Sequence, residues 1–344
     1  MSRTHEQSVR ERLARPPARG LFRALGLAFG IGLLGYLVWR LGPGEIAALL
    51  ASVRWSLAVA VLLFCAHQSA RAWALTACTP AGGRLAWRDA LAIRFSSEAV
   101  QYLAFSGPVL AQPTETWLLT RRGLGVWEGL ATTLAEYLVS ALVAAAMAVA
   151  SYGYVLGRLE TSGAFRAAGT VIAGLMALFI ALFIIGIGAR LHIIGAVVRW
   201  VGRLPVVGPR VRPAIGGLPN AEDLLIGVLR SPSRLARIAG IECAAQLCLV
   251  LELAVLLRAL QAGADPLTVA VLEGETKFVA TASSIVPGQI GVAEGSYAFV
   301  FAMFGLAAKT GVSVALVRRL RGAVVTALGI AALTRLTGQP PRRA

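Results

Sequence analysis

Long apolar runs constrain this chain more than any other feature of its sequence. Several runs reach about 18 residues or more, which lets a helix cross the roughly 30 Å hydrocarbon core of a bilayer. Hydrophobic residues make up 57% of the chain, more than the roughly half that is usual in soluble domains. The sequence therefore predicts an all-α, polytopic helical membrane protein with about six full spans. We expect these spans at 22–39, 56–78, 125–151, 167–188, 234–258 and 313–335.

The net charge of +16 is distributed as the predicted topology requires. Arginines concentrate before the first span, in segment 189–233 and at the C-terminal end, whereas 41–53 carries no basic residue. This alternation follows the positive-inside rule when the N-terminus is cytoplasmic. We therefore expect an inner (plasma) membrane protein whose two termini and 189–233 segment face the cytoplasm and meet anionic lipid headgroups there. Nucleic acid is not an expected partner, because the basic segments lack interleaved aromatics.

The cysteines and histidines form no metal or catalytic motif. The four cysteines lie in or at the ends of apolar runs without a CxxC or Cys/His spacing, so we expect buried thiols and no cofactor. His67 lies within a span next to Gln68, where we expect a hydrogen bond to a neighbouring helix. The N-terminal apolar run ends without a small-residue cleavage site, which favours a retained span over a signal peptide.

Two regions, 87–118 and 266–300, are too polar for ordinary spans and too apolar for loops. At an offset of 179 residues, each contains a proline followed seven positions later by a glutamate. Each also carries two opposite charges at i, i+4, which we expect to pair on one helix face. The proline–glutamate pairs are Pro108–Glu115 and Pro287–Glu294. The charge pairs are Arg94–Glu98 and Glu273–Lys277.

The same offset superposes whole spans and predicts an internal repeat. Span 56–78 falls on 234–258, and 125–151 falls broadly on 313–335. We therefore divide a single membrane domain, 22–336, into a first repeat at 53–160, the cytoplasmic linker 189–233 and a second repeat at 232–336. A basic leader (1–21) precedes this domain and a tail (337–344) follows it.

Each broken region is predicted to be a re-entrant hairpin of two half-helices. The repeats would then be inverted, with the first hairpin entering from the cytoplasm and the second from outside, an architecture found in transporters. Broken backbone at membrane depth is tolerated where it is buried in protein or lines a wet cavity. The alternative is a plain extracellular loop between two short spans. The predicted turn residues are Pro108, Pro287, Gly288, Gly291 and Gly295.

The second broken region and the last span resemble a known family. "IVPGQIGVAEGSYAFVFAMFGL" and "ALVRRLRGAVVTALGIAAL" are similar to the flippase-like domain in the membrane half of lysylphosphatidylglycerol synthases, and most to its stand-alone, hopanoid-biosynthesis-associated branch. In the first half, Gln112-Pro113-Thr114 stands before Glu115 where that family has a Gly-Gly-Glu element. The resemblance implies a membrane domain that handles or translocates a lipid, with an anionic or sugar-bearing head as candidates. The soluble aminoacyl-transferase half is not expected here, so synthase activity is not implied.

Three arginines in the last span are the main candidates for a lipid-head site. An ionisable residue at membrane depth costs roughly 2.5–3.5 kcal/mol on insertion scales, so it needs a partner or a function. Arg318 and Arg321 share a helix face, and paired guanidinium groups suit a phosphate. We predict one site from Glu294, Arg318 and Arg321. Arg319 and Glu115 are further candidates for this site, and snorkelling to the interface is the alternative for the arginines.

Other charges in the predicted spans need partners as well. Glu136 is a candidate partner for an arginine. The charges of the broken regions are further candidate partners, namely Arg94, Glu98, Glu273 and Lys277. Glu242 and Glu252 lie ten residues apart on roughly one helix face. They fit either proton-linked carboxylates or structural ion pairs.

Three classes of function remain compatible with these features. A lipid flippase or lipid-handling transporter accounts for the broken inverted hairpins and for the arginine pair. A non-catalytic partner or scaffold in a lipid-biosynthesis complex needs only the fold. A membrane-embedded enzyme is the least favoured class, since no nucleophile–base pair or metal set is visible in the sequence.

Overall fold

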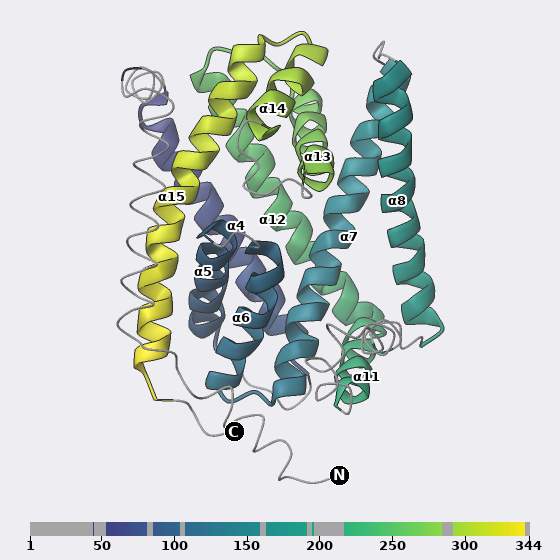
Figure 1. Cartoon of the computed structure of the whole chain (residues 1–344), viewed down its shortest axis with the longest axis vertical. Coiled ribbons are helices and arrows are strands. Elements are labelled where there is room, and N and C mark those ends of the chain that lie inside the picture. Colours follow the sequence, from purple (N-terminus) through teal and green to yellow (C-terminus); the bar gives the residue numbers. More distant parts are fainter. Residues whose placement is uncertain are drawn as a thin grey trace, which may run out of the picture.

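The computed structural model describes residues 53–80, 85–103, 107–158, 163–190, 217–283 and 292–340, together with 44 and 195. Within these residues all regular secondary structure is helical (Figure 1). The helices are α4 (Ser56–Cys78), α5 (Trp87–Leu103), α6 (Gly107–Arg121), α7 (Val126–Arg158), α8 (Gly163–Gly188), α11 (Leu218–Leu229), α12 (Pro232–Ala259), α13 (Pro266–Ser283), α14 (Val292–Met303) and α15 (Ala308–Gly338).

Four of the described helices are long and apolar enough to cross a membrane. They are α4, α7, α12 and the Arg166–Gly188 part of α8, and α4 has the bounds that the sequence predicts. The predicted last span lies in α15, whose 31 residues extend about 46 Å at roughly 1.5 Å per residue but carry several arginines. The predicted span 22–39 lies outside the described residues. The chain is an all-α polytopic membrane protein, as predicted.

Four short helices in the two predicted broken regions have fewer than the roughly 20 residues that a membrane crossing needs. α5, α6, α13 and α14 have 17, 15, 18 and 12 residues, and they occupy the two regions predicted to be broken. Figure 1 shows α5 and α6 in the lower half of the molecule and α13 and α14 in the upper half, whereas α7, α12 and α15 extend through both halves. The two pairs of short helices therefore start from opposite ends of the long helices.

One short helix of each pair packs against a long helix from the other half of the chain. α5 lies along α15, and α13 lies along α7. Within each half, α6 contacts α7 and α14 contacts α15, while α4 and α12 form an extensive contact at the centre. Long helices from both halves therefore cover each pair of short helices, which is where a membrane protein tolerates a broken backbone.

Glycines permit the close approach at both of these crossings. A Cβ on Gly329 of α15 would overlap the carbonyl group of Phe95 on α5, and a Cβ on Gly274 of α13 would overlap Ser151 on α7. Phe95 and Gly274 are related by the 179-residue offset. Gly329 and Ala150, which stands next to Ser151, are related by the same offset. The two crossings therefore lie at corresponding places in the two halves.

The two short pairs also end in the same way. The N–H of Leu124 donates to the carbonyl of Leu119 after α6 (3.3 Å), and the N–H of Leu306 donates to the carbonyl of Phe301 after α14 (3.0 Å). A glycine with positive φ stands just before each leucine, with φ values of 100° and 73°. This is the Schellman type of helix ending, and it turns the chain from a short helix into a long one.

The upper short pair begins at a capped helix end. Asp265 precedes α13 and accepts the backbone N–H groups of Leu267 and Thr268 at 3.0 and 3.1 Å, as an N-cap residue does. The Thr268 hydroxyl donates to the same carboxylate at 2.5 Å. The hydrogen bond from the Thr268 hydroxyl contributes most to lowering the pKa of Asp265 from its ordinary value, and the backbone hydrogen bonds lower this pKa further.

The predicted turn residues need a correction. Pro108 lies in the first turn of α6 rather than in the preceding break, and α6 continues through Pro113. Proline fits a first turn because its missing N–H has no partner to lose there. Gly295 lies in the first turn of α14. The other predicted turn residues, Pro287, Gly288 and Gly291, lie outside the described residues.

We predict that Gly329→Ala destabilises the fold. The new Cβ would meet backbone atoms of Phe95, which cannot rotate away, and overpacking of this kind costs about 1–3 kcal/mol. The thermal unfolding midpoint of the purified protein in detergent should fall. Gly240→Ala on α12 is the matched control, because no atom lies within 4 Å of a Cβ there. Equal midpoints for the two variants would contradict the close α5–α15 crossing.

Candidate functional site

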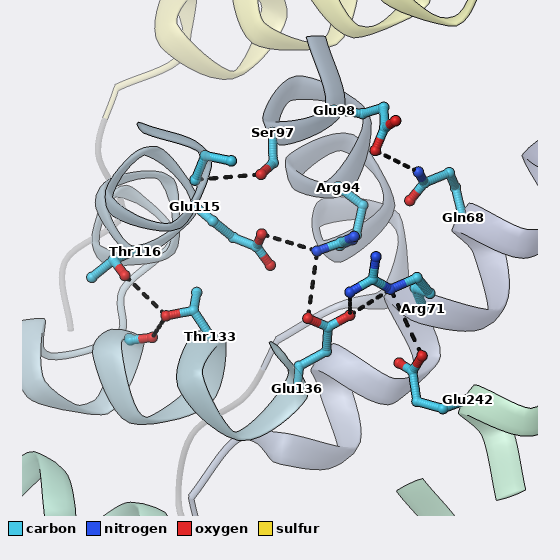
Figure 2. Close-up of polar contacts among 12 residues, drawn as sticks. Gln68, Arg71, Arg94, Ser97, Glu98, Glu115, Thr116, Thr133, Glu136 and Glu242 are labelled. Atoms are coloured by element: carbon cyan, nitrogen blue, oxygen red, sulfur yellow. Dashed lines mark hydrogen bonds and ion pairs between the residues drawn. The ribbon is translucent and has the colours of Figure 1, made fainter. Parts of the chain in front are cut away.

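Buried charged side chains from five helices meet around the α5–α6 pair. We call this group the first charge cluster, and Figure 2 shows its polar contacts. Its three carboxylates are fully buried, and Arg94 is nearly so. The members of the cluster are Arg71 on α4, Arg94 on α5, Glu115 on α6, Glu136 on α7 and Glu242 on α12.

Glu136 is the centre of the first charge cluster. Its carboxylate accepts Arg71 at 2.7 and 2.8 Å and lies 3.5 Å from Arg94. The same Nη1 of Arg94 donates to Glu115 at 3.1 Å. One carboxylate on α7 thus joins α4 to the α5–α6 pair through charge-assisted hydrogen bonds, which are stronger than neutral ones.

Glu242 lies at the edge of this cluster with weaker contacts. Its Oε2 is 3.8 Å from Nε of Arg71, beyond hydrogen-bond distance. Neither of its carboxylate oxygens has a hydrogen-bond partner among the described residues. Figure 2 shows Arg71 lying between Glu242 and Glu136.

The predicted pairing of Arg94 with Glu98 on one helix face is wrong. Arg94 instead reaches Glu115 and Glu136 on neighbouring helices, while Glu98 accepts the side-chain amide of Gln68 at 2.9 Å. Buried arginine gains more from two fully buried carboxylates than from one partly exposed neighbour on its own helix.

A second group of charges joins α12 to α13 and α15. We call it the second charge cluster, with the members Glu252 on α12, Glu273 and Lys277 on α13, and Arg318 and Arg321 on α15. Glu273 accepts Arg318 at 2.5 Å and Lys277 at 2.6 Å, so the predicted Glu273–Lys277 pair is confirmed. Glu252 pairs with Arg321 and lies 3.7 Å from Nε of Arg318. Both glutamates are fully buried.

Tyr297 on α14 completes this environment. Its hydroxyl accepts Nη1 of Arg318 at 2.9 Å, and the guanidinium also lies over the tyrosine ring. The second charge cluster therefore receives side chains from α12, α13, α14 and α15, as the first receives them from α4, α5, α6, α7 and α12.

The sequence predicted one site from Glu294, Arg318 and Arg321, but in this structure Glu294 contacts neither of these arginines. It pairs with Arg319 at 2.9 Å instead, and both side chains are partly exposed. Successive residues on a helix point about 100° apart, so Arg319 reaches Glu294 on α14, whereas Arg318 and Arg321 reach carboxylates on α12 and α13. Tyr102 on α5 donates to the backbone carbonyl of Arg319 at 3.1 Å.

The α4–α12 contact lies between the two clusters. The guanidinium of Arg321 lies 4.0 Å from the ring centroid of Phe64, and Phe64 stacks on His67. Nδ1 of His67 lies 2.9 Å from the carbonyl oxygen of Ala245 on α12, so the predicted hydrogen bond to a neighbouring helix is confirmed. His67 thus has a packing role at the centre of the molecule.

The two clusters are similar in layout and opposite in charge. Arg94 on α5 and Glu273 on α13 occupy equivalent positions at the 179-residue offset. Their partners, Glu136 on α7 and Arg318 on α15, each follow the first residue of their helix by ten positions. The first cluster has three carboxylates against two guanidinium groups, and the second has three cations against two carboxylates.

Sequence reasoning missed two of these contacts. Arg71 is a lone arginine inside the predicted span 56–78, so the rule that intramembrane charges need partners would have identified it. Tyr297 carries no such signal, because a tyrosine in an apolar helix is ordinary. No group of three or more His, Cys, Asp or Glu residues that could hold a metal ion is found in the described part of the chain.

Comparison with known protein families identifies a membrane-region family. The sequence model of the family described as "Lysylphosphatidylglycerol synthase TM region" matches residues 23–329. This range contains both charge clusters and both pairs of short helices. No curated protein and no solved structure matches the sequence significantly.

We predict that Glu136→Gln destabilises the protein strongly. Arg71 and Arg94 would lose their shared carboxylate, and breaking a buried ion pair costs about 3–5 kcal/mol. The yield of folded protein and its thermal midpoint in detergent should both fall. Arg258→Gln, a change at the exposed end of α12, is the control and should behave as the wild type. A Glu136→Gln protein with wild-type stability would show that the cluster does not hold the helices together.

Proposed function

Because the chain belongs to the lysylphosphatidylglycerol synthase transmembrane-region family, we propose that it is a lipid flippase-like transporter. In this proposal it binds a membrane lipid by its head and moves it across the bilayer. The matching family model describes the transmembrane region of a lysylphosphatidylglycerol synthase, which supports a lipid-related role in the membrane. The resemblance of "PGQIGVAEG" to the hopanoid-associated branch adds hopanoid-related lipids to the candidate substrates.

The arrangement of the short helices supports this proposal. Two pairs of short helices start from opposite ends of the molecule, and each packs against a long helix from the other half (Figure 1). The matching glycine crossings and helix endings support an inverted repeat of 53–160 and 232–336. Discontinuous helices in inverted repeats place substrate sites within the membrane and allow access to alternate between its two sides.

The second charge cluster is the proposed lipid-head site, and it is the observation that carries the proposal. Its cations outnumber its carboxylates, and within the described part of the chain the buried Nε atoms of Arg318 and Arg321 have no hydrogen-bond partner. A phosphate oxygen would satisfy these donors, since guanidinium groups bind phosphate through forked hydrogen bonds. Glu252 and Glu273 hold the arginines when no lipid is bound, and lipid entry would exchange one anion for another. The Arg319–Glu294 pair is a neighbouring contact outside this site.

The direction of the molecule in the membrane follows from its basic segments. We propose an inner-membrane protein with both termini and the 189–233 linker, which contains α11, on the cytoplasmic side, where anionic headgroups attract arginine. The α5–α6 pair would then enter from the cytoplasm and the α13–α14 pair from outside.

One observation favours the second candidate function, a non-catalytic partner in a lipid-biosynthesis complex. Every arginine of the two clusters has a carboxylate partner within the chain. Such pairs hold helices together without any ligand. A scaffold would therefore tolerate neutralisation of Arg318 and Arg321 together with their carboxylate partners, provided that the fold survives.

Lipid movement in proteoliposomes tests the proposal directly. We predict that Arg318→Gln or Arg321→Gln lowers the rate of movement of fluorescent phosphatidylglycerol between leaflets at least about tenfold, since hydrogen bonds to charged groups contribute about 1.5–3 kcal/mol. Arg318→Lys should restore little, because lysine keeps the charge but loses the fork. Arg258→Gln, at the exposed end of α12, is the matched control.

A measurement of stability separates folding from lipid binding. In Arg318→Gln, Glu273 keeps Lys277 as a partner and Glu252 keeps Arg321, so the remaining charges of the second cluster stay paired. Normal thermal stability with slow lipid movement supports the lipid-head site. Lipid movement at the wild-type rate in this variant would contradict the lipid-head site and favour the scaffold function.

The topology makes a separate prediction. Cysteines introduced at Arg230 and Gly263, at the two ends of α12, should react with a membrane-impermeant maleimide from opposite sides of the membrane. Both positions are exposed, and a background without the four native cysteines avoids other reactions. Labelling of position 230 from the periplasmic side would contradict the proposed orientation, and labelling of both from one side would contradict the span.

A further inference from the structure

The first charge cluster has an excess of negative charge, and Glu242 is its least compensated member. Glu115, Glu136 and Glu242 are all fully buried, and only Arg71 and Arg94 oppose them within the cluster. Glu136 contacts both arginines, and Glu115 contacts Arg94. Glu242 is left with a 3.8 Å contact to Arg71.

The surroundings of Glu242 do not stabilise an ionised carboxylate well. Arg71 already directs Nε and Nη2 at Glu136, at 2.8 and 2.7 Å. Both oxygens of Glu242 are buried and have no hydrogen-bond partner among the residues that the structure describes. An isolated buried charge is costly unless it is paired and hydrogen-bonded, and a carboxyl group in that position gains by taking up a proton.

The helices that pack against α12 bring no second cation into contact with Glu242. These helices are α4, α7, α11, α13 and α15. Their side chains near the lower half of α12 are Arg71, His67 and Cys78 from α4, Glu136 from α7 and Glu222 from α11, with Arg94 and Glu115 behind Glu136. Lys277, Glu273, Arg318 and Arg321, from α13 and α15, belong to the second cluster. That cluster lies around Glu252, about 15 Å further along α12.

We propose that Glu242 is a proton-binding site, and that its protonation is coupled to lipid movement. The coupling rests on the function proposed above, whereas the proton site does not. Proton uptake converts the carboxylate to a carboxylic acid and leaves Arg71 to Glu136 alone. Proton release makes Arg71 bridge α7 and α12 through two carboxylates.

Helix α12 connects the proposed proton site to the proposed lipid-head site. Glu242 and Glu252 are on the same helix, ten residues apart, so a shift of α12 against α4 changes both clusters. The protonated and ionised states differ in the contacts of Arg71, and a ligand can shift a conformational equilibrium only through such a difference. A proton in the first cluster and an anionic head in the second would neutralise the excess charge of both.

Infrared difference spectroscopy on the purified protein tests the proton site without lipid transport. A pH titration in detergent should show the C=O stretch of a carboxylic acid that Glu242→Gln removes. Glu275→Gln is the matched control, because Glu275 is also a buried carboxylate with an unpartnered oxygen but lies outside both clusters. The band should persist in sodium-free buffer. If no titrating band disappears in Glu242→Gln, or if sodium replaces the proton, the proposal is overturned.

Proteoliposomes with an imposed pH gradient test the coupling. The wild type and Glu275→Gln should move fluorescent phosphatidylglycerol several-fold faster with the gradient than without it, and in Glu242→Gln this ratio should fall to one. A wild-type ratio of one, or a full response in Glu242→Gln, would overturn the coupling. If the infrared band behaves as expected and the wild type moves no lipid at all, the transport function fails and the proton site stands.

Discussion

Charge buried at membrane depth is the constraint on which the rest of this structure depends. Each unpaired ionised group costs roughly 2.5–3.5 kcal/mol in a spanning helix, and this chain places arginines and glutamates on most of its helices. The cost is offset only when the helices close around one another so that the charges meet. Glu136 and Glu273 perform this role by binding two cations each. These contacts join α4, α5 and α7 in one cluster and α13 and α15 in the other.

Close backbone packing makes these contacts possible. The short helices α5 and α13 lie against α15 and α7 at glycine positions where a methyl group would not fit. Because the backbones approach this closely, side chains such as Arg94 and Glu273 reach the next helix rather than the surface. The glycines and the charges are therefore two parts of one arrangement, which holds broken helices within the membrane.

The two halves share a layout but differ in the sign of their charges, and this difference has a consequence for function. A symmetric pair of sites would bind the same ligand twice. Here the first cluster has more carboxylates than cations and the second has more cations than carboxylates, while α12 contributes Glu242 to one and Glu252 to the other. Such an arrangement suits a transporter in which a proton and an anionic lipid head influence each other through one helix.

The sequence by itself determined the helical class, four described spans and the positions of the two broken regions, because these depend on local hydropathy and on proline and glycine. It also identified Arg318, Arg321, Glu136 and Glu273 as charges in need of partners. Only the tertiary structure decided which partners they have. Arg94 pairs with Glu115 and Glu136 rather than with Glu98, and Glu294 pairs with Arg319 rather than with Arg318. Sequence spacing predicts which residues share a helix face, but the neighbour of that face is set by how helices from distant parts of the chain pack.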